Sequence, residues 1–337
     1  MSAAPLLALL IAAAPAAPAD VASDPSVRFA PSVVRPGDAI LVRVRLPPAG
    51  RPPSGTLAGR PLRFWRHGGE KWAIAGLPIE TPPGPVALEL VWGELDPIRS
   101  SASLEVVEPG FPSKTLSVAP KFVTPPASLK ARIARDQRAF AAAYARPFVA
   151  PLFSGSFAWP HDGAHHGRYG DRRVFNATKA SVHYGLDIDA PRGAPVRAAN
   201  DGEVVLARDC FYSGKTVVLW HGADLFTLYF HMDRLDVRPG AKVRQGEKLG
   251  VVGSTGRSTG PHLHWSAKVG ELYVDPESLM GIDFASGTAP PRRAGPPPPA
   301  PPPAEPPAPT ASPEAGAPHA AGPATAPPAA DAPARPR

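Results

Sequence analysis

G-P-H-L-H-W (residues 260–265) places two histidines one residue apart, behind the polar turn G-S-T-G-R-S-T of residues 253–259. In an extended strand, His262 and His264 point to one face, while Leu263 points to the other face and into a core. Two imidazoles so close together cannot serve as equivalent ligands of one catalytic metal without closing its site. We therefore expect one histidine to bind a metal and the other to face a substrate.

Proline and charge limit the kinds of protein that this chain can be. The 337 residues include 48 prolines, which are concentrated in the N-terminal third and the last fifty residues, so the globular part is smaller than the length suggests. The formal net charge of +7 is spread out without a long basic run, and no nucleic-acid motif is present. We therefore expect no nucleic-acid partner. Diffuse positive charge also suits an anionic bacterial cell wall.

The first residues predict export. An apolar core at Leu6–Ala14 is too short to span a bilayer, and the small-x-small pattern Ala17-Pro18-Ala19 follows it. This pattern predicts a signal peptide over residues 1–19, although its first residues contain no Lys or Arg. No later segment is apolar enough to cross a membrane. We expect a mature protein in the periplasm or in the extracellular cell wall, without a transmembrane segment.

The next segments predict an accessory domain and a linker. Between residues 27 and 108, apolar and polar residues alternate in short runs, as at Ile40–Leu46, which is typical of antiparallel strands. We predict an immunoglobulin-like β-sandwich over residues 20–115, with a hairpin that turns at Gly68-Gly69. Residues 116–150 form a linker whose helix, over 125–145, begins at a Thr124 cap and Pro125.

The remaining chain divides into a β-rich domain and a tail. Residues 151–284 are β-rich and carry all the motifs that suggest chemistry, so the fold class is mainly β. From residue 285 to 337 the chain is rich in Pro and Ala and has almost no large apolar side chains. Such a segment cannot bury a core, and we predict that it is disordered. The accessory domain or the tail would provide docking surfaces for partners in the cell envelope.

Three clusters together meet the demands of a catalytic zinc site. They are H-Y-G-L-D at 183–187, L-Y-F-H at 228–231 and the H-L-H pair. Catalytic zinc takes three protein ligands and leaves a position open for water. His183, Asp187 and either His262 or His264 can supply these ligands if the chain bends at Gly185, because a straight strand would separate residues 183 and 187 by about 13 Å. His231 and the second histidine of the pair remain as acid–base groups.

In this order, the motifs H-Y-G-L-D, Y-F-H-M and G-P-H-L-H-W resemble the lysostaphin/LytM-type zinc metallopeptidases, which cut peptide bridges in bacterial peptidoglycan. The resemblance covers roughly residues 153–280 and implies a lysostaphin-like antiparallel β barrel-sandwich (the duplicated hybrid motif fold). It implies one zinc ion per chain with ligands His183, Asp187 and His264, and the catalytic pair His231 and His262. The implied activity is hydrolysis of peptide cross-links in peptidoglycan by a metal-activated water.

Several other interpretations were weighed against the peptidase. The segment at 238–250 is similar to the hairpin of lipoyl and biotinyl carriers, but no lysine motif follows it. The glucose-specific phosphocarrier of bacterial sugar transport also pairs histidines, but it works in the cytoplasm. Cys210 is the only cysteine, and nothing around it supports a Cys–His nucleophile. The remaining alternative is a catalytically silent family member that binds the wall or regulates another hydrolase, and the intact ligand set argues against it.

Overall fold

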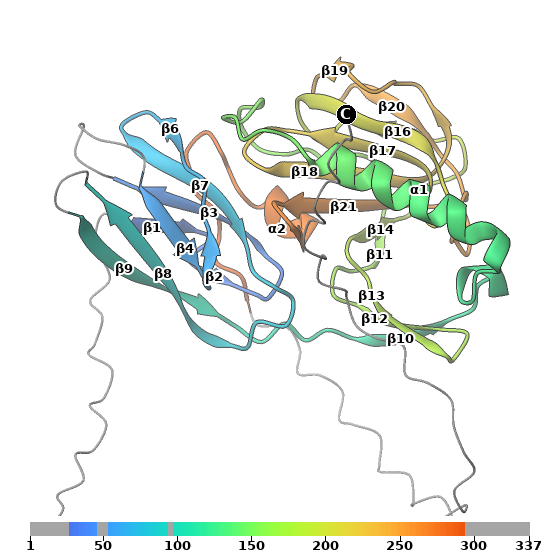
Figure 1. Cartoon of the computed structure of the whole chain (residues 1–337), viewed down its shortest axis with the longest axis horizontal. Helices are drawn as coiled ribbons and strands as arrows, with labels where there is room; N and C mark the ends of the chain where they lie inside the picture. Colours follow the sequence, from blue (N-terminus) through green and yellow to red (C-terminus); the bar gives the residue numbers. More distant parts are fainter. Residues whose placement is uncertain (1–26, 46–52, 94–96, 294–337) are drawn as a thin grey trace, which may run out of the picture. The chain divides into compact units, whose positions relative to one another are not determined.

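A computed structural model describes residues 27–45, 53–93 and 97–293, and it confirms a mainly β chain (Figure 1). The predicted signal peptide and most of the predicted tail lie outside the described residues. None of the described helices is long and apolar enough to cross a membrane.

The N-terminal part consists of two small sheets that share one core. The first sheet has the order β1 (Val27–Ala30), β3 (Ala39–Val44), β7 (Glu70–Gly76), β6 (Trp65–His67). The second has the order β2 (Val33–Val34), β9 (Ile98–Val106), β8 (Gly84–Trp92), β4 (Ser54–Leu57), β5 (Arg60–Pro61). Val42 and Leu88, one from each sheet, are fully buried in the shared core. The hairpin at Gly68-Gly69 is confirmed, since His67 pairs with Glu70; the immunoglobulin-like topology stays a prediction.

A short 3-10 helix at Pro120–Phe122 precedes the linker helix α1 (Ala127–Tyr144), which begins two residues later than the sequence predicted. The prediction of a Thr124 cap was wrong. Pro126 occupies the N-cap position and no side chain caps the helix, because two consecutive prolines keep the backbone extended up to residue 126. The helix lies along β16 (Figure 1), and Phe140 and Tyr144 pack against rings of β18.

The C-terminal part is built around a ten-stranded sheet. Its main path is β11 (His165–Gly167), β14 (Leu186–Ile188), β21 (Leu263–Val269), β18 (Leu225–Leu235), β17 (Gly214–Trp220), β16 (Gly202–Cys210), β19 (Lys242–Val243). Three more strands pair beside this path: β15 (Pro195–Arg197), β20 (Lys248–Val252), β22 (Leu272–Val274). Strand β21 lies between β14 and β18, and all of its residues are buried. This central strand carries His264.

A fourth, three-stranded sheet has the order β10 (Ser113–Leu116), β12 (Arg172–Phe175), β13 (Lys179–Val182). Strand β10 pairs in parallel with β12, although α1 lies between them in the sequence. No pattern in the sequence predicts this strand. Residues 113–116 fall across the expected boundary between the accessory domain and the linker, and S-K-T-L has no apolar alternation.

The predicted start of the tail at residue 285 was also wrong. Residues 285–293 are described, and Arg292 donates its backbone N–H to the carbonyl of Val33. The Arg292 guanidinium lies between two buried carboxylates: its Nε is 3.3 Å from Asp38 and its Nη2 is 2.6 Å from Asp275. Asp275 also accepts from the N–H of Glu277 and so caps α2 (Pro276–Met280). These contacts attach residues 285–293 to the rest of the fold, although the segment has little apolar surface of its own.

Asp275→Asn should reduce the pH dependence of the free energy of unfolding. Burial raises the pKa of Asp275 to about 7, against the opposing charge of Arg292, whereas an unfolded Asp has a pKa of about 3.9. The folded state therefore holds more protons between these values, and the stability that this carboxyl contributes is lost as the pH rises from about 4 to 7. Urea titrations across this range should show a smaller decline in the variant, in which asparagine still caps α2.

The matched control is Asp209→Asn, which changes an exposed carboxylate paired with Arg132. This control should keep the pH profile of the wild type. An unchanged profile in Asp275→Asn would show that the buried proton is held elsewhere.

Candidate functional site

The register between β14 and β21 brings two of the predicted ligands together. Asp187 lies directly opposite His264 in this antiparallel pair, and Phe230 of β18 lies opposite His264 on the other side. Leu263 and Trp265, which flank His264 in the sequence, are fully buried in the core. Because strand side chains alternate, His264 must point to the opposite face from its two neighbours, toward Asp187.

His183 reaches the same point from the turn that joins β13 to β14. This turn has its bend at Gly185, where the sequence placed it. Gly185 also leaves space for the site: a Cβ there would lie 2.8 Å from His264 Nε2 and 2.5 Å from Ser266 Oγ. Any side chain at residue 185 would therefore push against the ligand histidine.

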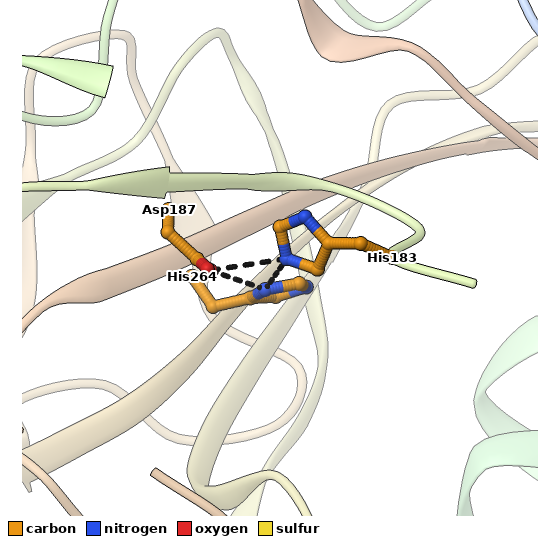
Figure 2. Close-up of side chains that lie close together, drawn as sticks. All are labelled: His183, Asp187 and His264. Carbon is orange, nitrogen blue, oxygen red and sulfur yellow. Dashed lines mark hydrogen bonds and ion pairs between the residues drawn. The ribbon is translucent and has the colours of Figure 1, made fainter. Parts of the chain in front are cut away.

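Three atoms face one another at the centre of this arrangement (Figure 2). His183 Nε2 is 2.9 Å from His264 Nδ1 and 3.1 Å from Asp187 Oδ1, and the last two atoms are 2.9 Å apart. Among the described residues, these three form the group of His, Cys, Asp or Glu side chains whose geometry suits a metal ion.

In each of the two histidine rings, one nitrogen faces the centre and the other faces away from it. The hydrogen bond of the outer nitrogen determines whether the inner nitrogen carries a proton or a lone pair. His183 Nδ1 lies 2.9 Å from the carbonyl oxygen of Arg168, which can only accept, so Nδ1 is the protonated nitrogen. His264 Nε2 lies 2.8 Å from Ser266 Oγ, and this hydroxyl donates to the carbonyl of Tyr184, so it accepts from His264. Both neutral rings therefore direct a lone pair at the centre, beside the Asp187 oxygen. Three converging lone pairs fit a bound cation.

The electrostatics of the site favour the same protonation states. Burial lowers the pKa of His264 to about 4, so the ring is neutral at pH 7. Burial alone would raise the pKa of Asp187, but hydrogen-bond donation and positive charge from His183 and His264 outweigh burial and hold the pKa well below its usual value. A cation bound between the two lone pairs would act on the Asp187 carboxylate in the same direction. The other Asp187 oxygen, Oδ2, accepts from Arg173 Nη2 at 2.6 Å. Asp187 is therefore ionised, and both of its carboxylate oxygens have partners that fix their orientation.

His231 enters the site from a β-bulge in β18. Tyr229 pairs with Val217 and Met232 pairs with Lys215, so two residues of β18 oppose one residue of β17. His231 has a φ of +62°, in the left-handed region that non-glycine residues seldom adopt, which is common where function demands a side-chain direction. Its Nδ1 donates to the carbonyl of Thr255 at 2.8 Å, and burial lowers its pKa to about 3. Its Nε2 therefore carries a lone pair.

His262 lies one residue before β21 and faces His231. Their ring centroids are 5.0 Å apart. His262 Nδ1 donates to the carbonyl of Gly260 at 2.8 Å, and its Nε2 is 3.6 Å from Asp187 Oδ1. Nε2 of His262 therefore faces Asp187, at the edge of the cluster that His183, Asp187 and His264 form.

All five residues predicted from the sequence line one cavity of about 470 Å³. The structure thus brings His183, Asp187, His231, His262 and His264 together, while their roles stay predictions. Cys210 is not among the lining residues; it is buried, and burial raises the pKa of its thiol to about 11. Such a thiol stays protonated and is a poor nucleophile.

Sequence reasoning missed four side chains of this site: Ser266, which orients His264, Arg173, which holds Asp187, and the cavity-lining Lys114 and Arg257. Ser266 follows His264 at the spacing that shares a strand face, which was a usable signal. Arg257 stands within the polar turn at 253–259, and Arg173 lies outside the quoted motifs; nothing in the spacing of either residue indicates which way its side chain points. Lys114 lies on the unexpected strand β10.

Comparison with known proteins agrees with this geometry. A sequence model of peptidase family M23 matches residues 181–276. Peptidoglycan DD-endopeptidase ShyA of Vibrio cholerae is 42% identical over 125 residues, which is 36% of this chain and 28% of ShyA. DD-carboxypeptidase/endopeptidase Mpg of Neisseria meningitidis is 43% identical over 98 residues, which is 29% of this chain and 23% of Mpg. The chain thus spans about a quarter of the length of these curated relatives.

The match to a solved structure covers more of the chain than the matches to the curated relatives do. A solved structure from Pseudomonas aeruginosa, described as an M23 peptidase, is 32% identical to this chain, with a TM-score of 0.54. The match covers 73% of this chain and 94% of the other. It therefore extends well beyond residues 181–276.

Ser266→Ala should weaken metal binding by about 10- to 100-fold, the usual effect of removing a partner that orients a ligand histidine. Without the Ser266 hydroxyl, the ring of His264 loses the acceptor that keeps its Nδ1 free of a proton. The affinity for zinc can be measured by competition with a chromophoric chelator. Ser181→Ala is the matched control, because Ser181 lines the cavity but contacts none of the three ligands. Equal affinities in the two variants would contradict the assigned tautomer.

Proposed function

The chain belongs to peptidase family M23, and on that premise we propose that it is a zinc-dependent endopeptidase that hydrolyses peptide cross-links of bacterial peptidoglycan. The observation that carries this proposal is the convergence of lone pairs from His183 Nε2, His264 Nδ1 and Asp187 Oδ1 on one point in an open cavity. The names of the relatives ShyA and Mpg support the choice of substrate.

The donor set suits zinc. Two neutral imidazoles and one carboxylate are a usual ligand set for catalytic zinc, which keeps a position open for water or substrate. When bound, zinc would polarise the scissile carbonyl and lower the pKa of water in the cleft toward neutrality. The hydrogen bonds from His183 to Arg168, from His264 to Ser266 and from Arg173 to Asp187 keep these three ligands in place.

We assign the proton transfers to His231 and His262. Each ring donates its Nδ1 proton to a backbone carbonyl and turns the lone pair of Nε2 into the cavity. One imidazole accepts the proton of the attacking water at its Nε2. This proton, on that ring or passed on to the other ring, can stabilise the developing oxyanion and is then delivered to the leaving amine. The chain's own chemistry requires no covalent intermediate, because the buried thiol of Cys210 does not line the cavity.

The alternative of a silent, regulatory family member is less well supported. Such a protein has no need for both a complete ligand set and two additional imidazoles whose lone pairs face the same cavity. Peptidoglycan lies outside the cytoplasm, so we further propose that the chain is exported and acts in the periplasm or the cell wall. Partners in the envelope would bind the N-terminal sheets or the tail.

The zinc requirement can be tested on purified sacculi with the full chain. The wild type should carry about one zinc per chain and lower the turbidity of the suspension. A chelator should abolish this lysis and added zinc should restore it. His264→Ala should carry no zinc and should not lyse, because the metal loses one of three ligands.

Two outcomes would overturn parts of the proposal. Undiminished lysis by His264→Ala would contradict the ligand assignment. Zinc-loaded wild type that releases nothing from sacculi would favour the regulatory alternative.

His231→Ala and His262→Ala separate catalysis from metal binding. Each variant should keep its zinc, since neither ring is a ligand, but should release soluble peptides about 10²- to 10⁴-fold more slowly. The release can be followed by chromatography of the digest, alongside metal analysis. His166→Ala is the matched control, because His166 lines the cavity without contacting the ligands, and it should keep its activity. Loss of zinc from His231→Ala or His262→Ala would show that the ring belongs to the ligand set.

A further inference from the structure

Arg257 lies in the polar turn that precedes the H-L-H pair, and the turn holds it firmly. Its backbone N–H donates to the carbonyl of Tyr212 at 2.7 Å. The neighbouring Gly256, at a φ of +74°, packs so closely on Gly214 that a Cβ would lie 2.3 Å from the Gly214 nitrogen. Thr255 in the same turn accepts from His231. The position of Arg257 is therefore coupled to that of a proposed catalytic residue.

The guanidinium of Arg257 is held by aromatic rings alone. Its Cζ lies 4.4 Å from the ring centroid of Phe175 and 5.3 Å from that of Tyr212. No side chain or carbonyl among the described residues accepts a hydrogen bond from this guanidinium or forms an ion pair with it. Arginine side chains in such a partly buried position usually have an acceptor, since their N–H groups lose water. Arg257 thus offers free donors within the cavity.

The charges around Arg257 favour an anion. Among the described residues that line the cavity, Lys114, Arg173 and Arg257 are cationic, and Asp187 is the one carboxylate. Asp187 is already bound to Arg173 and faces the proposed metal. Burial and the nearby charge of Arg173 both lower the pKa of Arg257, so both disfavour its charged form. An anionic group of a ligand would offset both effects.

We propose that Arg257 binds a free carboxylate of the substrate peptide close to the scissile bond. The site would thereby select cross-links that carry a carboxylate there and discriminate against cross-links that are neutral at this point. This inference rests on the proposed peptidase function and adds to it the chemistry of the substrate. The aromatic contacts pre-orient the guanidinium, so little side-chain entropy is lost when its N–H groups pair with two carboxylate oxygens.

The test compares two forms of one substrate, cross-linked peptide dimers released from sacculi and the same dimers with their carboxylates converted to carboxamides. The wild type should cleave the amidated dimer with a kcat/KM about 10- to 100-fold lower, the range of a lost charge-assisted hydrogen bond. Arg257→Gln should cleave both forms alike, at the rate of the wild type on the amidated form. Arg257→Lys should keep part of the discrimination, since it keeps the charge. Arg234→Gln, at an exposed arginine paired with Asp236, should behave as the wild type does.

Calorimetric binding of the two dimers to the zinc-loaded chain separates this inference from the peptidase proposal. If no form is cleaved but the wild type binds the free acid more tightly than the amide, and Arg257→Gln does not, the carboxylate site stands and the peptidase function fails. If wild type makes no distinction between the dimers, or if Arg257→Gln keeps the distinction, Arg257 has only a structural role. Thermal unfolding of Arg257→Gln checks that the variant is folded.

Discussion

The antiparallel register of β14 and β21 is the constraint on which the site depends, because it sets Asp187 opposite His264. Leu186 and Ile188 on one strand and Leu263 and Trp265 on the other are buried. A slip of either strand by one residue would expose its two apolar side chains and turn its polar group inward. The hydrophobic core thus fixes a distance between two ligand atoms. On the other side of β21, Phe230 stacks on the ring of His264, with centroids 5.1 Å apart.

Backbone carbonyls set the same tautomer, with the proton on Nδ1, in His183, His231 and His262. Those of Arg168, Thr255 and Gly260 each accept from an outer ring nitrogen, and Ser266 does the same for His264 through its own bond to Tyr184. A carbonyl cannot reverse its role as a hydroxyl can, so the protonated nitrogen is set by the path of the chain. Four rings from three segments of the chain therefore line one cavity. Lone pairs that face one another lower the stability of the fold unless a cation or a proton donor lies between them.

The gathering of the five candidate residues at one cavity was predictable because the signals are local: strand alternation at H-L-H, and a glycine between His183 and Asp187. The bulge at His231 was not, since L-Y-F-H-M has the pattern of an uninterrupted strand. The orientations of Arg173 and Arg257 depend on contacts with segments far away in the sequence, as does the attachment of residues 285–293 through Arg292. Pairing between β10 and β12 joins residues nearly sixty positions apart without any apolar pattern, and long-range pairing of this kind leaves no trace in a single sequence.

Strand β10 supplies part of the cavity wall from the N-terminal side of α1. Lys114, Leu116 and Val118 line the cavity, although they precede α1 and lie well before residues 181–276, which the family model matches. The residues that form the cavity are therefore not a continuous stretch of the chain. A recombination event that exchanged the N-terminal sheets at the apparent domain border would also replace one wall of the cleft. Accessory domain and substrate preference would then change together, in one step.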